Sequence, residues 1–137
     1  MARGRRRTVM EIQASNLRFT VDARDVGEDG GVSIKVLSTV GNKEAQLLRF
    51  DVFRKRPHYH YDPEGHGAEY NLDPLLIEDG LGWMLAQLRA KLPEMVTHAG
   101  FGEVAEEMDL SVILPIIDDI EREARVIEAE GIKAAAM

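Results

Sequence analysis

Three of the four histidines of this chain, His58, His60 and His66, lie close together in the sequence. Histidine changes its charge near neutral pH and also binds metal ions, so these residues suit proton transfer or metal coordination. On a strand, His58 and His60 would point to the same face, because side chains alternate. With Asp62 and His66 they form a candidate ligand set for a divalent metal such as zinc, and Glu64 and Asp51 are the other carboxylates that could complete it. We predict no other cofactor. The alternative is a pair of surface histidines without a ligand.

Basic and aromatic residues surround the histidines and extend the candidate site. Arginine neutralises phosphate, tyrosine stacks on unpaired bases, and histidine can pass a proton, which together would suit RNA cleavage. The alternative is that the basic run 54–56 only protects a hairpin end or an edge strand against aggregation. The candidate binding residues are Arg49, Arg54, Arg56, His58, Tyr59, His60, Tyr61 and Asp62.

The phase of the alternation decides whether the histidines are available. If Tyr59 and Tyr61 face the core, then His58 and His60 face the open side of the sheet. If the phase is reversed, the histidines are core residues and the site hypothesis fails.

Composition limits the classes of function. The chain has 137 residues, which suits a single domain, and it has no cysteine, which excludes disulfides, thiolate zinc sites and a cysteine nucleophile. The lack of cysteine and of any apolar run long enough for a membrane helix leads us to expect a cytoplasmic protein. The formal net charge of -7 disfavours tight binding to nucleic acid.

The first half of the chain has the alternation of β-strands. Apolar residues alternate over 9–22, with a break at Ser15-Asn16 that predicts a bulged strand or two short strands. Regular alternation over 32–36 and 48–52 predicts two more strands, and residues 58–61 would continue as a fourth. The short turns between them favour an antiparallel meander of three to four strands.

The second half has helical periodicity. Asp73-Pro74 resembles an N-cap followed by proline at the first helical position, which predicts a helix from there to Leu92. A short helix over 101–108 and a long amphipathic helix carrying Ile113 to Ile127 would follow. The predicted fold class is therefore α+β, with helices packed on one face of the sheet. We place a basic disordered tail at 1–8, one α+β domain at 9–130 and a frayed end at 131–137.

The segment 47–65, with the string PHYHYDP, followed by Leu72-Asp73-Pro74 and a helix that carries Trp83, resembles a family of small uncharacterised bacterial proteins defined as a domain of unknown function. The resemblance covers about residues 32–92 and implies no activity. A looser similarity, at 48–51 (LRFD) and the histidines, is to small toxins of toxin-antitoxin pairs. It adds some support to the RNA-cleaving alternative.

We expect a small cytoplasmic binding or interaction protein, with no membrane association, whose ligand or partner site lies at the PHYHYDP segment. A homodimer is predicted through the long C-terminal helix or a sheet edge, because the apolar stripe from Ile113 to Ile127 could pack against a second copy. The alternatives are an RNA-cleaving, toxin-like enzyme and a metal-binding protein with histidine and carboxylate ligands. We expect binding rather than catalysis.

Overall fold

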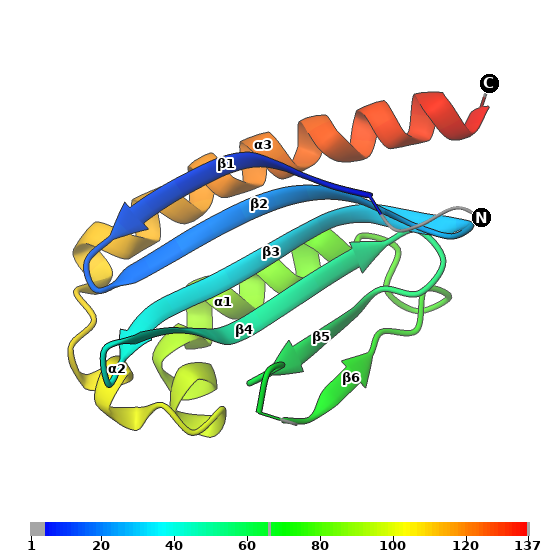
Figure 1. Cartoon of the computed structure of the whole chain (residues 1–137). Coiled ribbons are helices and arrows are strands. Elements are labelled where there is room, and N and C mark those ends of the chain that lie inside the picture. The colour runs from blue at the N-terminus through cyan, green and yellow to red at the C-terminus, as the bar shows by residue number, and fades with distance from the viewer. Residues whose placement is uncertain (1–4, 66, 137) are drawn as a thin grey trace.

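The computed structural model of the chain describes residues 5–65 and 67–136. Six antiparallel strands form one sheet in which each strand pairs with the next in sequence (Figure 1). The fold class is α+β, as predicted, but the prediction of three to four strands was wrong. The elements are β1 (Arg5–Ala14), β2 (Leu17–Val26), β3 (Asp29–Val40), β4 (Lys43–Phe53), β5 (His58–Tyr61), β6 (Glu69–Asn71), α1 (Gly80–His98), α2 (Gly102–Glu106) and α3 (Leu110–Ala136).

The extra strands come from both ends of the sheet. The region 9–22 forms parts of two strands, because Ser15, with a positive φ of 58°, and Asn16 make a tight turn between β1 and β2. Strand β6 has three exposed residues and is defined by its pairing with β5. Regular structure also extends into both predicted terminal segments, since β1 includes residues 5–8 and α3 includes residues 131–136.

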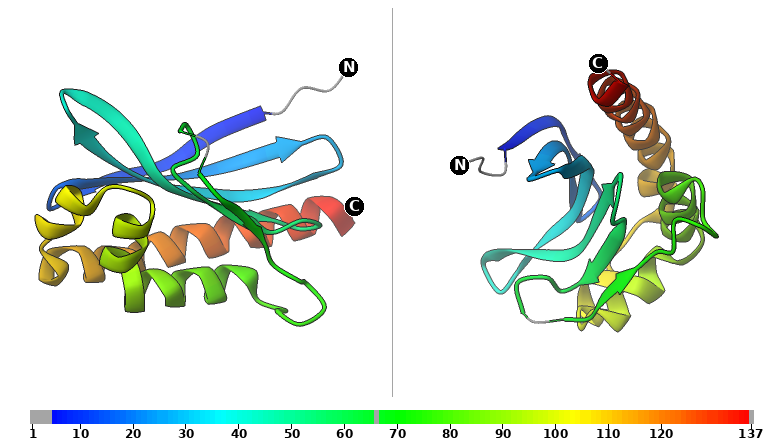
Figure 2. Two further views of the ribbon diagram at one scale, coloured as in Figure 1. Left: turned by 90° about the horizontal axis from the view of Figure 1, so that it is seen from below. Right: turned by 90° about the vertical axis from the view of Figure 1, so that its right-hand side faces the viewer.

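The helices form a second layer on one face of the sheet (Figure 2). Helix α1 packs against β4 and β5, whereas α3 crosses β1, β2 and β3. Along the middle of the long strands, the side chains that face these helices are apolar and buried, whereas the other face of the sheet is left open. The largest fully buried side chains are Leu17, Phe19, Ile34, Leu47, Leu48, Phe50, Leu81, Met84, Leu85, Leu88, Leu92 and Ile113.

Helix α1 differs from its prediction at both ends. It begins at Gly80, where the Asp79 carboxylate accepts a hydrogen bond of 3.0 Å from the Gly82 backbone N–H. Asp73 instead holds an isolated turn, because its carboxylate accepts a hydrogen bond from the Leu75 N–H. The helix continues past Pro93, and the backbone departs from helical geometry at Lys91 (φ -139°, ψ 21°), which accommodates the proline ring.

The apolar stripe of α3 packs inside the molecule. Its members Ile113, Ile117, Ile120, Ala124 and Ile127 are all buried, and all belong to the core shared with the sheet. None of the described helices combines the length and the apolar composition needed to cross a membrane.

Candidate functional site

The histidines and tyrosines of β5 lie on opposite faces of the sheet. Tyr59 pairs with Phe50 and faces the helices, whereas His58 pairs with Asp51 and His60 with Arg49 on the face turned away from them, which we call the open face. The candidate residues are therefore divided by the sheet. A base stacked on the tyrosines could not also contact the histidines.

Asp51 on β4 is the centre of a buried polar network on the open face. Only 1% of this residue is exposed. Its Oδ1 accepts a hydrogen bond of 2.7 Å from the Ser33 hydroxyl, and its Oδ2 accepts one of 3.1 Å from Arg49 Nε. The Nε2 atoms of His58 and His60 lie 3.1 and 3.2 Å from the same Oδ2. Burial raises the pKa of Asp51, but the hydrogen bonds from His58 and Ser33 and the charge of Arg49 outweigh it and hold the pKa well below its usual range.

The contacts of His58 favour its cationic form. Its Nε2 faces the Asp51 carboxylate, and its Nδ1 lies 2.8 Å from the backbone oxygen of Arg56, so both ring nitrogens face acceptors. The hydrogen bond to Asp51 raises the pKa of His58, although burial opposes it. Because only 4% of His58 is exposed, its pair with Asp51 is buried.

The surroundings of His60 favour its neutral form. Burial and the charge of Arg49 lower the pKa of His60. Its Nε2 lies 3.0 Å from the Arg49 guanidinium, a donor, and 3.2 Å from Asp51 Oδ2, an acceptor, while its Nδ1 lies 3.4 Å from a Glu69 carboxylate oxygen. Nε2 accepts from Arg49 in one tautomer and donates to Asp51 in the other. The network thus favours the charged form of His58 and the neutral form of His60.

Asp51, His58 and His60 offer three potential metal-ligand atoms that all lie within 4.8 Å of one another. Asp51 thus takes the place that Asp62 held in the predicted ligand set. However, the Arg49 guanidinium contacts both Asp51 and His60, and a protonated His58 has no free lone pair for a metal. The contacts therefore favour an ion-pair network, and metal binding stays a prediction.

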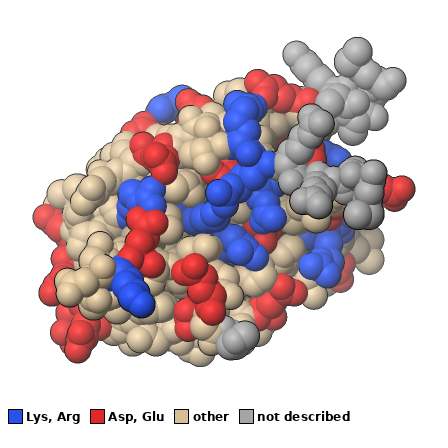
Figure 3. Space-filling model, viewed as in Figure 1, with Lys and Arg blue, Asp and Glu red and all other residues tan. Residues whose placement is uncertain are grey.

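Four basic side chains cover this network. Arg6, Arg24, Lys35 and Arg49, which we call the basic cluster, come from four successive strands. Arg6 lies directly opposite Arg24, and Lys35 directly opposite Arg49. Figure 3 shows Lys and Arg side chains gathered over the middle of this face, with acidic side chains around them.

The basic cluster carries more charge than the carboxylates beneath it. Asp22 lies 3.8 Å from both Arg6 Nε and Lys35 Nζ, and Asp51 Oδ1 lies 3.5 Å from Arg24 Nη1. Four side-chain cations and the protonated His58 therefore surround two buried carboxylates. Burial and the charge of Arg6 lower the pKa of Lys35, with smaller contributions from Arg49 and Arg24, while Asp22 opposes them.

The other candidate residues lie away from the network. Arg54 and Arg56 are exposed in the loop between β4 and β5, and Arg56 contributes its backbone oxygen to His58. Asp62 forms a turn with a positive φ of 45°, where its backbone oxygen accepts hydrogen bonds from the Gly65 and Gly67 N–H groups. His66 lies outside the described residues.

Tyr59 and Tyr61 belong to an aromatic cluster that joins β5 to α1. The Tyr59 ring stacks on Phe50 at 5.9 Å and lies 6.0 Å from Trp83, and the Tyr61 ring lies 4.7 Å from the ring of His98. These contacts give the tyrosines a packing role on the helix side.

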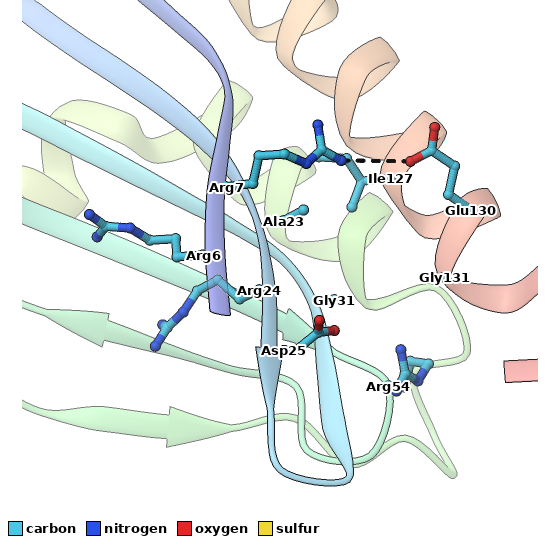
Figure 4. Close-up of a pocket in the computed structure, with 10 residues that line it drawn as sticks. All are labelled: Arg6, Arg7, Ala23, Arg24, Asp25, Gly31, Arg54, Ile127, Glu130 and Gly131. Carbon is cyan, nitrogen blue, oxygen red and sulfur yellow. Dashed lines mark ion pairs between the residues drawn. The ribbon is translucent and has the colours of Figure 1, made fainter. Parts of the chain in front are cut away.

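A large cavity of about 740 Å³ lies at the end of β1 and β2, beside α3 (Figure 4). Four arginines contribute to its wall, together with Ile127 and Glu130 of α3. In Figure 4, Arg6 and Arg24 point away from α3, whereas Arg7 reaches toward it and pairs with Glu130 at 3.9 Å. The charge of Arg7 is thus compensated by Glu130. Arg6 and Arg24 point away from α3 and belong to the basic cluster of the open face.

The sequence did not indicate Arg6, Arg24 or Lys35 as site residues. Lys35 lies between the apolar residues Ile34 and Val36, so the alternation does indicate that its side chain faces away from the core. Its position opposite Arg49 depends on the register between β3 and β4, which the residues of one strand alone do not determine.

Comparison with protein families matches residues 11–124 to a domain of unknown function, DUF7700. No curated protein and no solved structure matches the chain.

Proposed function

The chain belongs to the DUF7700 family, a domain of unknown function, and we propose that it binds a small anionic ligand, a phosphate or carboxylate compound, at the basic cluster of the open face. The supporting observation is that two pairs of like charges, Arg6 with Arg24 and Lys35 with Arg49, lie directly opposite each other. Like charges in this arrangement destabilise a sheet. An anion between them would convert the repulsion into attraction.

The partial burial of the cluster supports the proposal. The side chains of Lys35, Arg49 and Arg24 are 13%, 24% and 27% exposed, so their charges are screened less than those of ordinary surface residues. Arginine offers paired N–H groups that match phosphate and carboxylate oxygens. The two buried carboxylates of Asp22 and Asp51 are the partners of these four cations, so they do not neutralise all of the positive charge.

His60 would add a pH-dependent group to this site. Its pKa is lowered by burial and by the charge of Arg49, the member of the cluster that it contacts. RNA cleavage and metal binding remain alternatives for the same histidines. RNA cleavage has less support, because Tyr59 and Tyr61 face the helices, where they cannot stack on a base at the open face.

The test is isothermal titration calorimetry with inorganic phosphate and pyrophosphate. We expect binding that Lys35→Met weakens about tenfold or more, because it removes one charge-assisted contact while keeping most of the apolar stem. The unfolding free energy of this variant should not fall, since the fold disfavours the charged form of Lys35. Equal binding by wild type and Lys35→Met would contradict the proposal, as would no binding to wild type.

Arg18→Gln is the matched control for the titration. Arg18 lies on the same face but already pairs with Glu11 at 2.7 Å and with Glu44. Its replacement removes one positive charge from the face without changing the basic cluster. Phosphate affinity should therefore change less than in Lys35→Met.

We also retain the expectation of a cytoplasmic homodimer, through the sheet edge rather than the C-terminal helix. The stripe of α3 is buried within one chain, so it gives no reason for a dimer through this helix. Within the described residues, the outer edge of β1 pairs with no strand, which makes Arg5–Ala14 the candidate dimer edge. Light scattering should show a dimer at micromolar concentration, and a monomer would exclude this part of the proposal.

A further inference from the structure

A smaller cavity of about 220 Å³ lies on the open face next to the basic cluster. Arg6 and Lys35 of the cluster form part of its wall, and Thr20, Asp22 and Gln46 lie beside them. Among the residues that the structure describes, three buried side-chain atoms have no hydrogen-bond partner: Thr20 Oγ1, Asp22 Oδ1 and Gln46 Oε1. All three belong to residues that line this one cavity.

The unpaired atoms are well placed to bind a donor. Thr20 and Asp22 are 6% and 1% exposed, and a buried polar atom without a partner is costly. A carboxylate oxygen and an amide oxygen can only accept hydrogen bonds, and a threonine hydroxyl can both accept and donate. All three unpaired atoms can therefore accept a hydrogen bond from a donor in the cavity.

The charged groups around these atoms do not supply the missing donors. Arg6 Nε and Lys35 Nζ both lie 3.8 Å from Asp22 Oδ2, beyond hydrogen-bond distance. Arg18, on another side of the cavity, is already paired with Glu11 and Glu44. Because Arg6 and Lys35 hold Asp22 only loosely and have flexible stems, a ligand can displace them to reach the acceptors.

We propose that this cavity binds hydroxyl groups of the same ligand whose phosphate or carboxylate group lies on the basic cluster. This inference rests on the proposed anion-binding function and extends it to a small hydroxylated anion. Hydroxyl groups suit the wall because they donate to the acceptors without adding charge, and two of the three unpaired atoms, on Thr20 and Gln46, belong to neutral side chains. A hydroxyl can also accept a hydrogen bond from Lys35 or Arg6.

The test compares three phosphates of equal chain length by calorimetry on the full chain. Propyl phosphate carries no donor on its carbon chain, glycerol 3-phosphate carries two hydroxyls and 3-aminopropyl phosphate carries an ammonium group. We expect glycerol 3-phosphate to bind about tenfold more tightly than propyl phosphate, which corresponds to about 1.4 kcal/mol for satisfied acceptors. The same comparison between glycerate and propionate covers a carboxylate ligand, and a hydroxyl gain on either anion supports the proposal.

Thr20→Val removes one unpaired atom with little change in shape. It should reduce the gain from hydroxyls, measured as the ratio of the affinities for glycerol 3-phosphate and propyl phosphate, whereas Thr39→Val, at an exposed position of β3, should leave both affinities unchanged. If propyl phosphate binds and hydroxyls add nothing, the hydroxyl proposal is wrong and the anion site stands. A preference for 3-aminopropyl phosphate would also overturn it, and if no anion binds, both proposals fail.

Discussion

Asp51→Asn tests the polar network directly. In the native chain, the Asp51 carboxylate accepts hydrogen bonds from Ser33 and Arg49 and forms a buried ion pair with His58. Asparagine can still accept from Ser33, but it places an N–H group against the N–H donors of Arg49 and His58. Removal of one partner from a buried ion pair costs about 3–5 kcal/mol. We expect a loss of this size in the unfolding free energy, measured by urea denaturation with far-UV circular dichroism.

A matched control and a double-mutant cycle make the result specific. Asp119→Asn removes an exposed carboxylate whose Arg122 partner lies 2.8 Å away, and it should cost less than about 1 kcal/mol. In the cycle of Asp51→Asn with His58→Gln, the double mutant should lose less than the sum of the single mutants, because both remove the same ion pair. A loss for Asp51→Asn as small as that of the control would refute the buried network.

The pH dependence gives a second readout of the same pair. The folded pKa of His58 is raised above 6.5, so its contribution to stability is complete below 6.5 and is lost as the pH rises through the folded pKa. The lowered pKa of His60 affects stability only below pH 6.5, where the unfolding free energy falls as the pH falls. The lowered pKa of Lys35 changes the unfolding free energy only at more alkaline pH. Wild-type stability should therefore fall just above pH 6.5. This slope should disappear in Asp51→Asn, and a slope that persists there would show that Asp51 does not cause the His58 shift.

Three further predictions concern the fold and the cluster. Lys35→Met should raise the unfolding free energy in the absence of ligand, measured by urea denaturation, because it removes a charge that burial and the nearby charge of Arg6 disfavour; a loss of stability would contradict this reasoning. Gly31→Ala should lower the melting temperature, because Gly31 has a φ of 150° and the new Cβ would lie 2.5 Å from the Val52 oxygen, a strain of about 1–3 kcal/mol; an unchanged melting temperature would show that the backbone relaxes. Leu88→Ala should cost about 2–5 kcal/mol in urea denaturation, because Leu88 is fully buried, and a loss below about 1 kcal/mol would mean that the core collapses around the cavity.

The alternation of residues was enough to predict the faces of the middle strands. The register of β4 and β5 places His58 and His60 on the open face, which is one of the two predicted phases, but both side chains are largely buried there, at 5% and 12% exposed. Alternation could not reveal β6, because Glu69–Asn71 is short and exposed and becomes a strand only by pairing with β5. The predicted number of strands was therefore too low, because a short strand such as β6 is defined by its pairing with a neighbour and not by a local sequence pattern.

The start of α1 shows a limit of local capping signals. Asp73 followed by Pro74 has the chemistry of a helix start, and Asp73 does accept a backbone hydrogen bond, but in an isolated turn. The helix begins seven residues later, at Gly80, where Asp79 caps it and Arg125 of α3 binds the same carboxylate at 2.8 Å. The contact with α3 comes from a distant segment, which no local pattern of residues 73–80 encodes.

The arrangement of charge explains why a small anion suits this face better than a nucleic acid. The acidic residues Glu11, Glu44 and Glu64 line the cavity next to the basic cluster, and the chain as a whole carries -7. A single phosphate can contact the cations while it stays clear of most of these carboxylates. A polynucleotide must place neighbouring phosphates within one screening length, about 8 Å at physiological salt, where they meet the surrounding acids. The acidic surroundings should therefore reject polyanions more strongly than single anions, which would give the proposed site selectivity by size as well as by charge.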